Sequence, residues 1–523
     1  MKGESFPSPE LRSNRAADVR VVAKGGAVQL LGQFTQKGLT FVFVAIAVRF
    51  LGTADYGLYR QVFQILMIAT TLAAGGFPAA AVRFIAQARA ANDPEVARGA
   101  ARVALAGAAI ASSLVFLVVF VYADELAAVF ADSASATNYL AFLLRVGAAF
   151  IPLYGCMQVM RFCTQAYKTM TPSVMVGNVI QPATRYGLTL IALTVGLAVA
   201  GAVAALVVSA AIALAASLWY YRRLLSTDER KATPRADVGA MLRFAFPQAG
   251  VSLFSTQSLG LGVLLVGAFR GDEQVGLYGI AQSLQLAGGL FLGSIVGIWA
   301  PVVVDLYHRG DLLRLQSLYQ TINRWVATFS VPIFVAMMIQ PEFFTRLIGG
   351  QGAADAAVLV LILAAGNLFF VATGPSSHLL SMTGRPGINL INSLTSVGLY
   401  AGLGIWLVPI YGVIGMAVVD AIVTILLNIA RVVEGKIIVG IQPFGRTFYK
   451  PLAATLVGGG VLVLLRLILG TSMSMALTSL VVAGVVYLGF LKLLGLDPEE
   501  REVIEAIKTR FASILGRRKR PPR

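Results

Sequence analysis

The sequence predicts an all-α protein that crosses a membrane many times. Of its 523 residues, 57% are hydrophobic and 13% are charged, and the mean hydropathy is +0.78, far outside the range of soluble proteins. Dividing the chain by hydropathy gives about 14 transmembrane helices, because each apolar run has the roughly 20 to 28 residues that a bilayer crossing requires. These spans lie near 23–50, 58–82, 101–122, 138–163, 172–195, 198–221, 239–268, 275–304, 319–340, 354–380, 387–408, 411–434, 449–468 and 474–494.

The net charge of +17 is concentrated in alternate loops. By the positive-inside rule those loops are cytoplasmic, so we expect both termini in the cytoplasm and an even number of spans. A basic excess arranged in this way reports membrane orientation and argues against nucleic acid as a partner. The segment between the sixth and seventh spans is an example, with the cations Arg222, Arg223, Arg230, Lys231, Arg235 and Arg243.

The two halves of the chain carry the same sparse sequence pattern. A glycine-rich turn followed by Leu-Tyr occurs at 52–59 and again at 271–278. Colinear identities of this kind favour two repeats of six spans, related by an axis along the membrane normal, over a chance coincidence of glycine and proline. Further matches join Pro172, Asn178, Val199 and Gly201 to Pro386, Asn392, Val413 and Gly415.

The predicted domain organisation follows from these repeats. Two extra spans with few polar residues follow the second repeat, and the chain ends in an apolar stripe and a run of cations that suit an anionic membrane surface. A solvated polybasic end is the alternative for the last few residues. The expected units are a cytoplasmic N-terminal segment (1–22), a first lobe (23–222), a cytoplasmic linker (223–238), a second lobe (239–438), two extra spans (439–495) and a basic amphipathic cytoplasmic tail (496–523).

The first span carries polar residues on one face. Steps of three and four residues place them in a single helical stripe, which consists of Gln29, Gln33, Gln36, Lys37 and Thr40. A lysine near the middle of a span costs about 3 kcal/mol, so Lys37 should face protein or a water-filled cavity. The simpler interpretation is that the amides bind neighbouring helices and that the lysine snorkels to the membrane interface.

Two more cations, Arg145 and Arg185, lie within spans of the first lobe, where we expect no carboxylate at comparable depth. Unpaired cations are tolerated in a hydrated cavity, and they favour an anion, most economically a phosphate or diphosphate. Snorkelling of one cation is again the alternative. The polar residues expected to line the same cavity are Asn178 and Gln181, on the helical face of Arg185, together with Arg60 and Gln64 at the start of the second span.

The second lobe has the opposite sign, because Asp420 is its only deep carboxylate. An intramembrane aspartate among oxygen-bearing side chains suits a proton or a sodium ion, so we expect coupling to one of these ions. The simpler interpretation of Asp420 is an aspartate that is hydrogen-bonded across a helix contact. His378 could carry a proton, and the simpler interpretation is a histidine whose hydrogen bonds are made within the bundle. The candidate ion-coupling residues are Asp420, Thr424, Asn392 and Gln248.

Signals for an enzyme are absent from the sequence. The chain has two histidines and two cysteines, with no metal-binding spacing and no phosphate-binding P-loop. We therefore expect no catalytic residue, metal or organic cofactor.

Several short motifs resemble those of the multidrug/oligosaccharidyl-lipid/polysaccharide (MOP) exporter superfamily, and most closely its polysaccharide transporter branch of Wzx-type flippases. The motifs are GGAVQLLGQ at 25–33, RFLG at 49–52, DYGLY at 55–59, MTGRP at 382–386 and YGVIG at 411–415. The resemblance implies two six-helix lobes in a V around a central cavity, in the bacterial inner membrane. It also implies that Lys37, Arg145 and Arg185 meet a diphosphate and that Asp420 belongs to an ion site.

The leading hypothesis is a flippase for a polyprenyl-diphosphate-linked oligosaccharide, which serves cell-surface polysaccharide synthesis by alternating access. Its expected partners are the lipid-linked substrate, membrane lipids and a glycan polymerase or other glycan-assembly proteins. A lipid II flippase for peptidoglycan and a MATE-like multidrug/cation antiporter are alternatives within the same superfamily. A membrane scaffold of a glycan synthase is the alternative from another class, and the deep cations argue against it.

Overall fold

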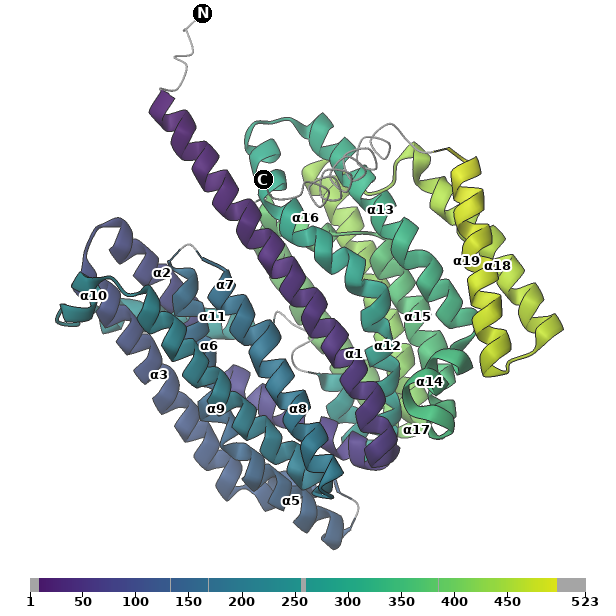
Figure 1. Cartoon of the computed structure of the whole chain (residues 1–523), viewed down its shortest axis with the longest axis horizontal. Helices are drawn as coiled ribbons and strands as arrows, with labels where there is room; N and C mark the ends of the chain where they lie inside the picture. Colours follow the sequence, from purple (N-terminus) through teal and green to yellow (C-terminus); the bar gives the residue numbers. More distant parts are fainter. Residues whose placement is uncertain (1–8, 132, 168, 255–259, 384, 496–523) are drawn as a thin grey trace, which may run out of the picture.

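The computed structural model describes residues 9–131, 133–167, 169–254, 260–383 and 385–495. Helices dominate these ranges (Figure 1). The first half contains α1 (Pro9–Ala74), α2 (Phe77–Ala90), α3 (Pro94–Val121), α4 (Ala123–Ala128), α5 (Ala134–Ala148), α6 (Phe150–Gln165), α7 (Thr171–Val174), the π-helix η1 (Met175–Ile180), α8 (Gln181–Thr194), α9 (Ala198–Leu224) and α10 (Thr227–Lys231). The second half contains α11 (Val238–Phe254), α12 (Leu261–His308), α13 (Leu312–Ile339), α14 (Pro341–Gly349), η3 (Gly350–Ala356), α15 (Ala357–Ala372), α16 (Ser376–Met382), α17 (Pro386–Glu434), η4 (Gly435–Val439), η5 (Arg446–Phe448), α18 (Tyr449–Leu469) and α19 (Met473–Leu493).

Nine helical stretches within the described ranges are long and apolar enough to cross a membrane, which confirms the predicted class. Three of the long helices fold back at a glycine with positive φ: α1 at Gly52 (80°), α12 at Gly271 (76°) and α17 at Gly412 (63°). Glycine adopts this conformation without the steric penalty that a side chain brings. Because a folded helix can supply two crossings, the total of about 14 stays a prediction.

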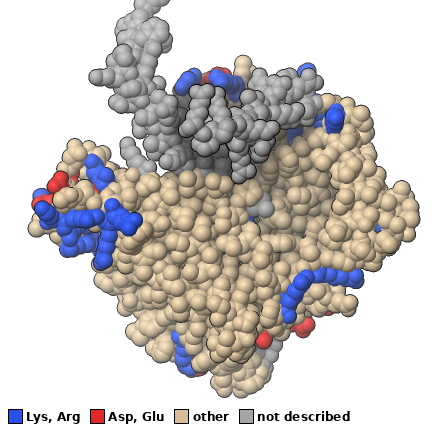
Figure 2. All heavy atoms as spheres, in the orientation of Figure 1, with Lys and Arg blue, Asp and Glu red and all other residues tan. Residues whose placement is uncertain are grey.

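The helices form two bundles on either side of α1 (Figure 1). In the first bundle α9 packs against α6 and α8, and α3 packs against α2 and α6. In the second, α12 and α15 pack against α13 and α17. Most of the surface in Figure 2 is uncharged, and lysine and arginine gather in a few patches on it. These bundles contain the two predicted lobes, whose exact boundaries stay predictions, and the predicted tail (496–523) lies outside the described residues.

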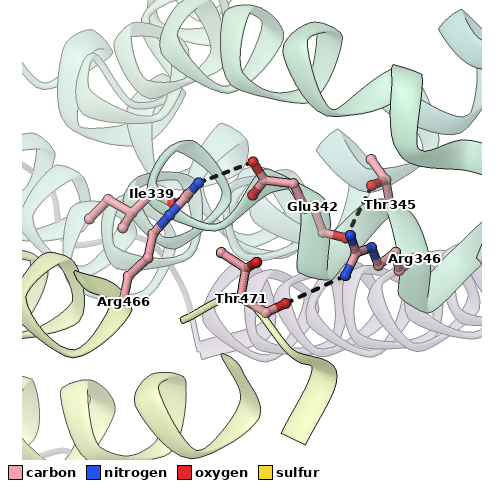
Figure 3. A network of polar contacts seen from close by, with 6 residues as sticks. All are labelled: Ile339, Glu342, Thr345, Arg346, Arg466 and Thr471. Atoms are coloured by element: carbon pink, nitrogen blue, oxygen red, sulfur yellow. Dashed lines mark hydrogen bonds and ion pairs between the residues drawn. The ribbon is translucent and has the colours of Figure 1, made fainter. Parts of the chain in front are cut away.

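The last two helices, α18 and α19, pack against each other and, through α18, against α13 (Figure 1). Arg466 of α18 donates hydrogen bonds to the Ile339 carbonyl and, over 3.1 Å, to a carboxylate oxygen of Glu342 (Figure 3). Arg346 donates to the Thr471 carbonyl, which lies between α18 and α19, over 3.5 Å (Figure 3). These bonds hold the two extra spans against the second bundle.

The bundles meet where the two glycine-rich turns pack together. A Cβ atom on Gly57 would lie 1.8 Å from the carbonyl oxygen of Asp272, and one on Gly276 would lie 1.9 Å from that of Thr53. Arg60 of α1 adds a 2.8 Å hydrogen bond to Oε1 of Gln282 in α12. The repeated turns therefore face each other, and each requires a glycine because the opposite backbone leaves no room for a side chain.

The substitution Gly57→Ala should destabilise this contact. The added methyl group forces the two backbones apart, and overpacking of this kind costs about 1–3 kcal/mol. We expect a lower midpoint of thermal unfolding for the purified protein in detergent.

Gly289→Ala is the matched control, since nothing lies within 4 Å of its Cβ position. Equal unfolding midpoints for the two variants would show that the turns do not need to pack so closely.

Candidate substrate-binding site

A short π-helix positions the polar residues of the fifth predicted span. The π-helix η1 ends at Ile180 and α8 begins at Gln181, with Pro182 in its first turn. Asn178 is buried and donates a 2.7 Å hydrogen bond from Nδ2 to Oε1 of Gln36 in α1. The widened turn of a π-helix often marks a functional position, and here it directs an amide towards the polar stripe of the first span. The two predicted stripes therefore meet at Gln36 and Asn178.

Arg185 is held by aromatic side chains. Its guanidinium carbon lies 4.5 Å from the ring centres of both Phe63 and Tyr186, and Nη2 donates a 2.7 Å hydrogen bond to the Tyr186 hydroxyl. That hydroxyl also lies 2.9 Å from Oγ1 of Thr40, and Phe43 stacks on the Tyr186 ring at 4.2 Å. Arginine is attracted to the negative face of an aromatic ring, so these contacts stabilise its charge without a carboxylate.

The cation nevertheless retains hydrogen-bonding capacity. Nε of Arg185 is buried and has no hydrogen-bond partner among the described residues, and neither has the buried Nε2 of Gln181. Lys37, on α1 between Gln36 and Thr40, is half-buried and makes no hydrogen bond or ion pair within the described ranges. Gln29 and Gln33 continue the same stripe and are also half-buried. Two cations of the first bundle are thus available to an anion.

Arg161 of α6 is a third such cation, which the sequence analysis did not include in the site. A Cβ atom on Gly177 of η1 would lie 1.7 Å from its Nη1, so the guanidinium rests directly on the π-helix next to Asn178. Its Nε is buried without a hydrogen-bond partner in the part of the chain that the structure describes. In the sequence Arg161 lies two residues before the end of the predicted span 138–163, where a long cation can snorkel to the membrane interface, so its position gave little signal for a site.

Three predicted site residues lie in other contacts. Arg145 forms a 2.5 Å ion pair with Asp124 of α4, and the two side chains are 38% and 54% exposed. The expectation that no carboxylate accompanies Arg145 is therefore wrong, because α4 places an acid beside it. Arg60 binds Gln282 of the second bundle, and Gln64 touches the backbone at Gly260, so both belong to the contact between the bundles.

In the second bundle Asp420 is bound by two tyrosines. The Tyr278 hydroxyl donates to Oδ2 over 3.0 Å, and the Tyr400 hydroxyl donates to Oδ1. Tyr278 follows Gly271 at the same spacing as Tyr59 follows Gly52. The spacing from Tyr400 to Gly412 also equals that from Tyr186 to Ala198. Gly412 and Ala198 both have positive φ (63° and 43°), which supports the alignment of the repeats.

Among the other predicted ion-coupling residues, Thr424 lies one helical turn from Asp420 and beside Tyr400, whereas Asn392 pairs with a different acid. Asn392 donates a 2.8 Å hydrogen bond to Glu434 near the end of α17. The Thr424 carbonyl accepts a 2.7 Å bond from Asn428, and Gln248 lies half-buried on α11. His378 has a local contact, 3.2 Å from Nδ1 to Oγ of Ser377.

Comparison with known proteins identifies the class. A model of the family described as polysaccharide biosynthesis protein matches residues 22–307. The stage V sporulation protein B of Bacillus subtilis (strain 168) is 22% identical over 426 residues, which cover 77% of this chain and 80% of that protein. The fold and the matches define a multi-pass membrane transporter of the MOP superfamily. Within it, the chain belongs to the polysaccharide biosynthesis protein family.

Solved structures share this fold. The lipid II flippase MurJ in an inward closed conformation has a TM-score of 0.72 at 13% identity, over 91% of this chain and 99% of that one. An inward-facing multidrug resistance transporter of the MATE family has a TM-score of 0.65 at 16% identity, over 79% of this chain and 98% of that one. These likenesses confirm the predicted fold.

Tyr278→Phe should destabilise the second bundle. Removing the hydroxyl leaves one oxygen of the half-buried Asp420 without its donor, which costs about 1–3 kcal/mol. We expect a lower thermal unfolding midpoint for this variant. Tyr411→Phe is the control, because Tyr411 is 62% exposed and its hydroxyl makes no hydrogen bond in the described ranges. If both variants unfold at the wild-type temperature, the tyrosine bond to Asp420 contributes nothing.

Proposed function

We propose that the protein is a flippase that moves a polyprenyl-diphosphate-linked oligosaccharide from the inner to the outer leaflet by alternating access. The observation that carries the proposal is the half-buried Arg185, whose charge rests on two aromatic rings, whose Nε is buried without a hydrogen-bond partner, and which has no carboxylate partner among the described residues. A diphosphate supplies the missing negative charge and accepts hydrogen bonds from a guanidinium.

In this proposal different residues of the first bundle bind different parts of the substrate. Arg185 and Lys37 bind the diphosphate, and Arg161, which rests on η1 at Gly177, adds a third positive charge. The amides of Gln29, Gln33 and Gln181 bind sugar hydroxyls, while the polyprenyl tail remains in the bilayer. No chemical step on the substrate is needed, because two conformations with different affinities for the headgroup are sufficient.

In one of the two conformations of the cycle, the bundles are in contact at the glycine turns. The close approach at Gly57 and Gly276 and the bond from Arg60 to Gln282 close the end of the molecule at these turns, and breaking them opens it. Asp420 is the proposed site of the coupling ion, a proton or a sodium ion, where the cycle uses one. Each of its oxygens accepts one tyrosine hydroxyl and has a second lone pair left for the ion.

Two alternatives use the same fold. A lipid II flippase also carries a diphosphate, and the lipid II flippase MurJ shares this fold over 91% of this chain. A multidrug antiporter is disfavoured, because a cationic drug would be repelled by Lys37, Arg161 and Arg185.

Loss of Lys37 and Arg185 together should strongly reduce transport. In proteoliposomes that contain a fluorescent polyprenyl-diphosphate sugar, with the leaflet reported by quenching, we expect the translocation rate of the variant Lys37→Ala/Arg185→Ala to fall at least about tenfold. Removing one hydrogen bond to a charged group costs about 1.5–3 kcal/mol, which already corresponds to this factor or more. The same translocation assay with lipid II in parallel vesicles shows which of the two lipids the protein moves.

Arg145→Gln is the matched control and should retain wild-type transport, since Arg145 binds Asp124. Full activity of the double variant would refute the site and leave the flippase function standing. No protein-dependent movement of either lipid, with a proton or sodium gradient imposed in either direction, would refute the function itself.

A further inference from the structure

A basic cavity lies at the edge of the first bundle, away from α1. It has a volume of about 390 Å³ and lies between the start of α3, the end of α9 and the linker helix α10. In Figure 2 the corresponding patch of lysine and arginine is at the left of the molecule, over the region of α10 in Figure 1. The lining residues are Arg98, Trp219, Arg222, Arg223, Leu225 and Arg230.

The four arginines of this cavity have no carboxylate partner among the described residues. The nearest buried acid, Glu229 of α10, is already engaged. It forms a 2.6 Å ion pair with Arg89 and accepts a 2.8 Å hydrogen bond from the backbone N–H of Ser226. The cavity therefore holds four positive charges and no compensating side chain.

Two of the arginines fix the wall of the cavity and two are left for a ligand. Arg98 donates to the carbonyls of Arg230 and, over 2.9 Å, Ala232. Arg230 in turn donates over 2.8 Å to the carbonyl of Arg222. These bonds hold the linker on α3 and α9. The side chains of Arg222 and Arg223 make no hydrogen bond within the described ranges, and Arg223 lies 3.8 Å above the Trp219 ring.

The depth of the cavity indicates the kind of anion. Trp219 lies near the end of the candidate membrane span Ala198–Leu224 and is 46% exposed. Exposed tryptophan at the end of a span marks the level of the lipid headgroups. Trp219 and Leu225 also give the cavity an apolar wall, which suits the glycerol and acyl carbons of a lipid better than a free anion.

We propose that this cavity binds the phosphate of an anionic phospholipid headgroup and that Arg222 and Arg223 are its ligands. The guanidinium groups match the phosphate oxygens, and cations at a membrane surface attract anionic lipid. The bound lipid joins the end of α9 to the linker between the bundles.

The test measures lipid binding to the purified full-length protein in detergent. Native mass spectrometry counts bound dioctanoyl phosphatidylglycerol, with dioctanoyl phosphatidylcholine and inorganic phosphate as separate probes. We expect saturable binding of phosphatidylglycerol to wild type, and affinity at least about tenfold lower for Arg222→Gln/Arg223→Gln, because each cation near the surface contributes about 1 kcal/mol. Neither substituted side chain holds the linker, so this variant should keep the wild-type unfolding midpoint.

The control Arg314→Gln/Arg385→Gln removes the same charge from exposed positions of the second bundle and should bind like wild type. Equal loss in both variants would show a general charge effect and overturn the site. Phosphatidylcholine binding as tight as phosphatidylglycerol would also overturn it. Competition by inorganic phosphate at the lipid's own concentration would assign the cavity to a soluble anion and overturn the lipid as ligand.

Discussion

The charge of Arg185, inside a predicted membrane span, is the constraint on which the first bundle depends. A guanidinium inside a membrane protein needs compensation, and here it comes from two aromatic faces and a tyrosine hydroxyl rather than from an acid. An ion pair at this position would be neutral and would bind an anion weakly. The aromatic support keeps the full positive charge available, and it also fixes the direction of the side chain.

The two bundles use one framework for opposite charges. Tyr59 and Tyr186 occupy positions in the first repeat that correspond to Tyr278 and Tyr400 in the second. The first pair lies by Phe63 and Arg185, and the second pair donates to Asp420. A phenol suits both, because its ring face attracts a cation and its hydroxyl donates to an anion. The repeated fold therefore provides the tyrosines, and the charged residue beside each pair, Arg185 or Asp420, decides which ion that pair faces.

The sequence predicted the membrane class, the repeats and the stripe of the first span, since these depend on local periodicity. The hydrogen bond between Asn178 and Gln36 agrees with the predicted polar stripes, because each residue lies on the polar face of its own helix. The pairs of Arg145 with Asp124 and of Asn392 with Glu434 were missed. The first depends on the short helix α4, which begins directly after α3 and packs against α5, the helix that carries Arg145. The second depends on the fold of α17 at Gly412, which returns the end of the helix to its beginning.

The linker constrains how the bundles can move. Arg235 donates its N–H to the Glu95 carbonyl over 3.1 Å, and a Cβ on Gly99 would lie 2.1 Å from the Arg235 carbonyl oxygen. Together with the bonds of Arg98, these contacts attach the linker to α3 almost up to the start of α11 at Val238. The linker therefore moves with the first bundle. The first turns of α11 also belong to the first bundle, because Ala245 packs on α2 and a Cβ atom on Gly76 would lie 2.0 Å from the Ala245 carbonyl oxygen. In the proposed alternating-access cycle the second bundle would therefore pivot beyond this contact and at the glycine turns, where the backbones touch without side chains between them.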